Sequence, residues 1–193
     1  MASRERIFGV VVPVPHSLSR IADRIRRRCD PNFRLIGPHV TVLPPRPLSL
    51  TRSEVLEAVK RVAERTPPFP LRLGGVKTFL PVKPVVFVGF RRGTADLQRL
   101  HRRLSRAPLR AREPFPYVPH LTLGQELDGG RLRAALALSR KTFASFAALK
   151  AWRAESLVVV ERCSASRWIT LDPLFLRRVS PPGTDRARRA RRR

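Results

Sequence analysis

Residues 37–45 read GPHVTVLPP and residues 118–124 read VPHLTLG, so the order Pro, His, apolar, Thr, apolar occurs twice in one chain. The sequence contains four histidines, and two of them, His39 and His120, stand in this shared pattern. A single such stretch is weak evidence, but its repetition around two of only four histidines indicates a shared role. The segments before and after each repeat are therefore compared with each other.

Each repeat has the features of a β-strand that presents two side chains on one face. Side chains alternate along a strand, so His39 lies on the same side as Thr41, and His120 on the same side as Thr122, each pair about 7 Å apart. The Val and Leu residues between them then face the core. Proline lacks an N–H, and the proline before each His fits the first position of a strand.

The segments around the two motifs follow one another in the same order, which predicts a duplicated unit. Strand starts are 78 residues apart and the two histidines are 81 apart. We expect the halves to be related by a pseudo-twofold axis, with each bringing one His strand to a shared cleft. Further strands near 69–79, 146–151, 156–162 and 168–172 would complete two sheets. In the first half we expect a strand at 6–12, an apolar helical stripe at 18–25, the motif, and a helix after a capping box at 51–54. In the second half we expect a strand at 84–90, a helix at 97–104, the motif, and a helix through 132–136.

These patterns predict an α+β, bilobal, duplicated fold with two mainly antiparallel sheets, helices outside and a central cleft. We expect one two-lobed domain over residues 1–180, with pseudo-repeats at about 5–80 and 81–178. Residues 181–193 form an Arg-rich tail with little apolar content, and we expect this tail to be disordered.

The formal charge of +26 favours polyanionic partners. Without residues 181–193, which contain six Arg and one Asp, the charge is still +21, so the body itself is strongly basic. Arginine binds phosphate through two parallel hydrogen bonds and stacks on bases, which favours nucleic acid. A general bias of the source towards Arg is the alternative explanation.

Cysteine usage and the N-terminus predict a cytoplasmic protein. Cys29 and Cys163 lack any metal-ligand or Cys-x-x-Cys spacing, which is typical of a reducing compartment. The apolar run at 7–15 is short for a signal peptide, and no stretch is long enough to span a membrane. We therefore expect no membrane partner, and a monomer.

Two histidines on opposite sides of a cleft can divide acid–base work between them. One neutral imidazole accepts a proton from an attacking oxygen while the other, protonated, donates to the leaving oxygen. The ordinary histidine pKa of about 6.5 makes both forms available near neutral pH. Threonine hydroxyls can donate to phosphoryl oxygens. This scheme requires no metal and no other cofactor, and the sequence contains no typical metal-ligand motif.

The paired motifs PHVTV and PHLTL, about eighty residues apart, resemble the His-x-Thr-x motifs of the 2H phosphoesterase superfamily, in particular its bacterial 2'-5' RNA ligase (LigT-like) branch. The resemblance covers roughly residues 5–178. It implies a LigT-like fold and hydrolysis of 2',3'-cyclic phosphate ends of RNA. It also implies that His39 and His120 are the acid and base, and that Thr41 and Thr122 hold the phosphate. Many relatives have a basic residue just after the second motif, where this chain has Gln125.

Other residues near the motifs are candidates for substrate contacts. Phe79 and Tyr117 could stack on a base or ribose, although aromatic residues beside strands are more often part of the core. Arg46 could contact phosphate, with a solvated loop arginine as the alternative. His16 and His101 are expected on the surface, outside the site.

The leading hypothesis is a metal-independent phosphodiesterase that opens 2',3'-cyclic phosphate ends of RNA or oligonucleotides. One alternative is a 2'-5' RNA ligase or 2'-5' phosphodiesterase that uses the same histidines. A second alternative is a non-catalytic RNA- or nucleotide-binding module. Nothing in the sequence decides which histidine is the acid and which the base.

Overall fold

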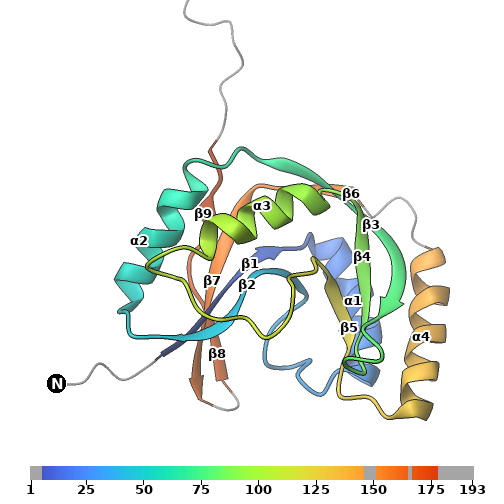
Figure 1. Ribbon diagram of the computed structural model, residues 1–193. Coiled ribbons are helices and arrows are strands. Elements are labelled where there is room, and N and C mark those ends of the chain that lie inside the picture. Colours follow the sequence, from blue (N-terminus) through green and yellow to red (C-terminus); the bar gives the residue numbers. More distant parts are fainter. Residues whose placement is uncertain (1–5, 146–150, 165–166, 178–193) are drawn as a thin grey trace, which may run out of the picture.

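Nine β-strands and four α-helices form the part of the chain that the structure, a computed structural model, describes, namely residues 6–145, 151–164 and 167–177 (Figure 1). In chain order they are β1 (Arg6–Pro13), α1 (His16–Cys29), β2 (His39–Leu48), α2 (Arg52–Ala63), β3 (Phe69–Thr78), β4 (Val86–Arg92), α3 (Thr94–Leu104), β5 (Leu121–Gly124), α4 (Gly129–Ala144), β6 (Ala151–Ala154), β7 (Ser156–Ser164), β8 (Arg167–Thr170) and β9 (Leu174–Phe175).

The strands join into one sheet whose order is symmetric about its centre. The order is β6-β3-β4-β5-β2-β1-β7-β8, with β9 added beside β7. The two motif strands, β5 and β2, lie next to each other at the middle. Each is flanked by the first strand of its own half, β4 and β1 respectively. The predicted duplication thus corresponds to a sheet with its pseudo-twofold axis at the β2–β5 pair.

The two halves of the sequence exchange their outer elements. Strand β3 from the first half pairs with β4, and β7 from the second half pairs with β1. The helices also cross over, because α1 packs mainly against β5 and α3 packs against β2. In Figure 1, α2 and α3 lie together at one end of the sheet, and α1 and α4 lie together at the other. Each lobe therefore needs both halves of the sequence.

Each lobe has its own hydrophobic core between helices and sheet. In one core, Val55 of α2 and Leu100 of α3 pack on Val40 of β2. In the other, Ile25 of α1 and Leu132 of α4 pack on Leu121 and neighbouring strand residues. The apolar residues of the motifs anchor both cores, so the motif histidines and threonines must lie on the opposite face of the sheet.

The α+β, LigT-like fold predicted from the sequence is confirmed, with one difference in the sheets. The two expected sheets are joined into one by the β2–β5 pair. The capping box at Thr51 and Glu54 forms as predicted, with the Thr51 side chain accepting from the Glu54 N–H. Among the described helices, none is both long and apolar enough to cross a bilayer. The predicted tail at 181–193 lies outside the described residues.

Gly93, at the turn between β4 and α3, is required by both conformation and space. Its φ is 92°, and a Cβ there would lie 2.4 Å from a Leu71 methyl and 2.8 Å from the Pro70 carbonyl oxygen. Gly93→Ala should therefore lower the free energy of unfolding in urea by roughly 1–3 kcal/mol. Gly75→Ala is the control, because a Cβ at Gly75 meets nothing within 4 Å. Equal stability of the two variants would contradict this explanation.

Candidate active site

The two motifs lie side by side in antiparallel strands at the centre of the sheet. The observed pair is Val40 opposite Leu121. Because the strands are antiparallel, continuing this register places His39 opposite Thr122 and Thr41 opposite His120. The four side chains thus form a crossed set, in which each histidine neighbours the threonine of the other half. Diagonal neighbours in such a ladder are about 7–8 Å apart, which is the expected spacing of the two histidines.

The alternation of burial predicted for the motifs is observed. Val40, Val42, Leu121 and Leu123 are fully buried on the helix-covered face. His39, Thr41, His120 and Thr122 are all half-buried on the other face. The structure therefore brings the four predicted motif residues together on one surface.

The two histidines have the same hydrogen bond. Nδ1 of His39 lies 2.7 Å from the carbonyl oxygen of Gly37, and Nδ1 of His120 lies 2.7 Å from the carbonyl oxygen of Val118. A carbonyl can only accept, so each Nδ1 carries the proton and each Nε2 is left to react. In the neutral ring Nε2 accepts a proton, and in the protonated ring it donates one. Both rings are thus prepared for acid–base chemistry through the same atom.

Burial lowers the pKa of both histidines below the ordinary value. For His39, burial is the largest cause and the bond to the Gly37 carbonyl opposes it; the positive charges of Arg26 and His120 lower the pKa further, by less. For His120, burial lowers the pKa, and the bond to the Val118 carbonyl partly opposes it. Both imidazoles therefore favour the neutral form until an anion is bound nearby.

Two phenylalanines form an aromatic wall beside His120. The ring of Phe79 is 4.9 Å from the His120 ring, centre to centre, in an edge-to-face arrangement, and Phe87 is 5.5 Å away. The two phenylalanine rings stack on each other at 4.0 Å. Phe79 thus lies at the site, as predicted, and its contact with substrate stays a prediction. Phe87 was not identified from the sequence, because it reads as an ordinary apolar residue of a strand.

The surroundings of His39 are different. A small hollow of about 70 Å³ lies beside it, with almost wholly apolar walls. The residues that line it are Gly9, Val11, Ile36, His39, Thr41, Leu43, Pro45, Val160 and Trp168. The two histidines are therefore chemically alike but have different neighbours, which gives the site two distinguishable sides.

Tyr117 braces the motif strand β2 from the loop between α3 and β5. Its hydroxyl donates to the Thr41 carbonyl oxygen at 2.8 Å, and its ring stacks on His101 at 4.0 Å. Burial raises the pKa of Tyr117, so this hydroxyl stays protonated and remains a donor. Stacking of a substrate base on Tyr117 stays a prediction. His101 itself is not on the surface as expected, since its side chain is 12% exposed and its Nδ1 bonds to the Val42 carbonyl at 3.0 Å.

The prediction that Arg46 contacts phosphate is wrong for this structure. Arg46 is 4% exposed, and its guanidinium is paired with Glu113. Its other N–H groups donate to the carbonyl oxygens of Pro44 and Leu109. The guanidinium is therefore occupied by contacts within the protein, and these contacts connect β2 with the loop after α3. No local pattern indicates this ion pair, because Glu113 is 67 residues from Arg46 in the chain.

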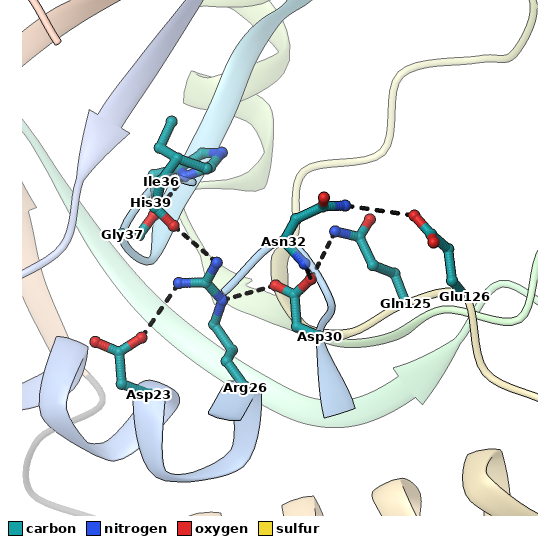
Figure 2. A network of polar contacts seen from close by, with 9 residues as sticks. All are labelled: Asp23, Arg26, Asp30, Asn32, Ile36, Gly37, His39, Gln125 and Glu126. Carbon is teal, nitrogen blue, oxygen red and sulfur yellow. Dashed lines mark hydrogen bonds and ion pairs between the residues drawn. The ribbon is translucent and has the colours of Figure 1, made fainter. Parts of the chain in front are cut away.

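A network of polar contacts, which was not identified from the sequence, connects the segments next to the two motifs. It joins the end of α1, the segment before His39 and the residue after β5, Gln125 (Figure 2). The side-chain amide of Gln125 donates to the Asp30 carboxylate at 2.8 Å. A signal was present in α1, where Asp23, Arg26 and Asp30 are spaced three and four residues apart, as in helical ion pairs.

Within the described residues there is no cluster of three or more His, Cys, Asp or Glu side chains with the arrangement of a metal site. Cys29 is buried and Cys163 is exposed, and both are free thiols. The groups available for chemistry at the motifs are thus two imidazoles and two hydroxyls.

Comparisons with known proteins show the family to which the chain belongs. The family model of the 2'-5' RNA ligase superfamily matches residues 13–163. A protein of Halalkalibacterium halodurans named as a phosphoesterase is 38% identical over 124 residues, which span 63% of this chain and 71% of that protein. A protein of Bacillus pumilus with the same kind of name is 33% identical over 122 residues, with 63% and 71% covered. The match to the family model extends over both motifs.

Solved structures share the fold at low sequence identity. Escherichia coli LigT complexed with 3'-AMP superposes with a TM-score of 0.58 and 17% identity, over 90% of this chain and 99% of that one. A second crystal structure, of a phosphoesterase, gives a TM-score of 0.59 at 20% identity, over 91% and 100%. The chain belongs to the 2'-5' RNA ligase superfamily, and the predicted class of 2H phosphoesterase is supported by the family match and by its phosphoesterase relatives.

Proposed function

We propose that this protein is a metal-independent phosphodiesterase that hydrolyses 2',3'-cyclic phosphate ends of RNA or oligonucleotides. The observation that carries the proposal is that two histidines and two threonines lie on one face of the adjacent strands β2 and β5, and that each histidine has its Nδ1 bonded to a carbonyl oxygen. The net charge of +26 supports a polyanionic substrate. Escherichia coli LigT, which shares the fold, was crystallised with the nucleotide 3'-AMP, and this supports a nucleotide ligand.

The reaction would proceed by in-line attack of water on the cyclic phosphorus. One neutral imidazole takes a proton from the water as the new P–O bond forms. The bond from phosphorus to one ribose oxygen breaks, and the other imidazole, protonated, gives its proton to that oxygen. The product is a ribose phosphomonoester with the second ribose hydroxyl restored. The threonine hydroxyls donate to the non-bridging oxygens, where negative charge increases.

Spacing supports the use of both rings on one phosphate. Hydrogen bonds from two Nε2 atoms to oxygens on opposite sides of one phosphorus place these nitrogens roughly 6–8 Å apart, given donor–acceptor distances near 2.8 Å. The diagonal Cα separation expected across the β2–β5 pair, about 7–8 Å, allows both imidazoles to reach one phosphate.

The test is an end-group assay with three substrates in parallel: an oligonucleotide with a 2',3'-cyclic phosphate, a 2'-5' dinucleotide and a cyclic mononucleotide. We expect the cyclic end to be converted to a phosphomonoester, with the same rate in EDTA. No turnover of either cyclic substrate, or loss of activity in EDTA, would contradict the proposal. A 2'-5' ligase or phosphodiesterase is the second candidate, favoured by the superfamily that matches the chain. Preferential turnover of the 2'-5' dinucleotide would select it.

The lowered histidine pKa values predict a characteristic pH profile. For kcat/KM one imidazole must be neutral and the other protonated in the free enzyme. Burial lowers the pKa of both His39 and His120, so the bell-shaped profile should have its maximum below about pH 6.5. Above that pH both rings are neutral and the acid is lost; well below it both are protonated and the base is lost. The anionic substrate favours imidazolium, so the profile of kcat should lie at higher pH. A kcat/KM maximum clearly above about pH 6.5 would contradict this assignment.

A further inference from the structure

The two motif strands are held together by a very short stretch of sheet. The ladder between β1 and β2 extends from Arg6 opposite Leu48 to Pro13 opposite His39. Between β2 and β5 only Val40 and Leu121 are paired. The relative position of the motifs therefore depends on contacts outside the ladder. A misplacement of reacting groups by about 1 Å can cost on the order of 100-fold in rate, so the nature of these contacts matters.

One set of such contacts is centred on Arg26, which is almost completely buried at the end of α1 (Figure 2). Its Nε donates to Asp30 at 3.0 Å, and one terminal nitrogen donates to Asp23 at 3.2 Å. The other terminal nitrogen donates to the Ile36 carbonyl oxygen at 2.8 Å. The next carbonyl, that of Gly37, is the acceptor of His39 Nδ1. Arg26 thus holds the backbone that orients His39.

The buried Asp30 carboxylate continues the network to the second motif. One oxygen accepts from Arg26, and the other accepts from the Asn32 N–H at 3.0 Å and from the Gln125 side-chain amide at 2.8 Å. Gln125 follows directly after β5, three residues beyond Thr122. Asp30 therefore bonds both to the arginine that holds the segment before His39 and to the residue after the strand that carries Thr122.

The backbone also makes this contact close. The Gln125 N–H donates to the Cys29 carbonyl oxygen at 3.0 Å. Gly124 allows this approach, because a Cβ there would lie 2.9 Å from both Cβ and the carbonyl oxygen of Cys29. The end of β5 is thus pressed against the end of α1, 95 residues away in the chain. The buried Arg26–Asp30 pair lies at this junction, so its contacts can fix how the end of β5 is placed relative to α1.

We propose that Arg26, Asp30 and Gln125 are positioning residues that clamp the two motifs together across the β2–β5 junction, so that His39 and the second-half residues His120 and Thr122 can act on one phosphate. This inference rests on the proposed function for its kinetic consequences. It predicts that Gln125 serves catalysis through Asp30 and the backbone, without contact to the phosphate. A purely structural ion pair would instead affect folding and not the rate of the folded enzyme.

The clamp is tested by Gln125→Leu, which keeps the size of the side chain and removes the donor to Asp30. We expect kcat to fall by about 10–100-fold with KM changed less than threefold. Gln125→Lys, which can again donate to Asp30, should recover most of the rate. Gln98→Leu is the matched control: it makes the same substitution at a half-buried glutamine of α3, outside the network around Arg26 and Asp30. Its kcat should stay within twofold of the wild-type value.

Two further measurements separate positioning from general damage. In a His39→Ala background, Gln125→Leu should leave the residual rate nearly unchanged, because the ring that the clamp orients is already gone. The His39 pKa, followed by NMR in the unliganded protein, should shift in Gln125→Leu and not in Gln98→Leu; this readout needs no turnover. An unchanged kcat and an unchanged His39 pKa in folded Gln125→Leu would overturn the clamp. A shifted pKa without turnover of any substrate by the wild-type protein would keep the clamp and reject the proposed function.

Discussion

Replacement of either His39 or His120 by alanine should lower kcat for opening a cyclic phosphate by roughly 10²–10⁴-fold. Each imidazole has its Nδ1 held by a carbonyl oxygen and so transfers a proton through Nε2, which the alanine variant lacks. The loss should appear in kcat more than in KM, because proton transfer takes place in the transition state. Single-turnover conversion of a labelled cyclic-phosphate oligonucleotide measures both variants.

The double variant is informative because the two histidines act on one reaction step. Removal of both should cost little more than removal of one, since groups that work as a unit are not additive. His16→Ala is the control, as His16 is exposed at the start of α1 and belongs to neither motif. A non-catalytic binding module would show altered affinity in these variants and no rate to lose. Full activity of either single variant would contradict the proposed mechanism.

Replacement of Thr41 or Thr122 by valine should reduce kcat by about 100-fold. Valine has the shape of threonine and suits a strand, so the change removes the hydroxyl with little effect on packing. Both hydroxyls lie on the same face as the histidines, where they can donate to non-bridging oxygens as charge develops. The same single-turnover assay measures the loss.

The matched control for the threonines is Thr170→Val, because Thr170 is an exposed strand residue in β8 at the edge of the sheet. It should retain wild-type kcat. Since each threonine neighbours the histidine of the other half, Thr41→Val and Thr122→Val should have effects of similar size. A loss confined to KM would show that the hydroxyls bind the ground state and the transition state equally well, contrary to the role proposed for them.

Much of the fold follows from local patterns in the sequence. The apolar residues Val40 and Leu121 alternate with the polar motif residues, and this period of two fixed which face each side chain would take. The capping box at Thr51 predicted the start of α2 within one residue. The crossing of α1 and α3 to the opposite lobe was not predictable, because amphipathic stripes show that a helix packs on a sheet without indicating which strands it covers.

The part of the candidate site that lies in the repeated motifs was predictable from the sequence. The part that depends on contacts between distant segments was not. The motif histidines carry a pattern within seven residues of sequence, whereas Arg46 meets its partner Glu113 across 67 residues. Burial turned Arg46 from a candidate phosphate ligand into part of an ion pair. Gln125 also gained a meaning only in three dimensions, through its bond to Asp30.

The most direct measurement is an NMR titration of the histidine rings with a nucleoside monophosphate, in EDTA, on the wild-type protein. If both imidazoles hold one phosphate, the pKa values of His39 and His120 should rise together and reach their limits at one equivalent of ligand, while His16 is unaffected. A response from only one of the two motif histidines, or saturation of each at a different ligand ratio, would contradict a shared phosphate and with it the proposed reaction.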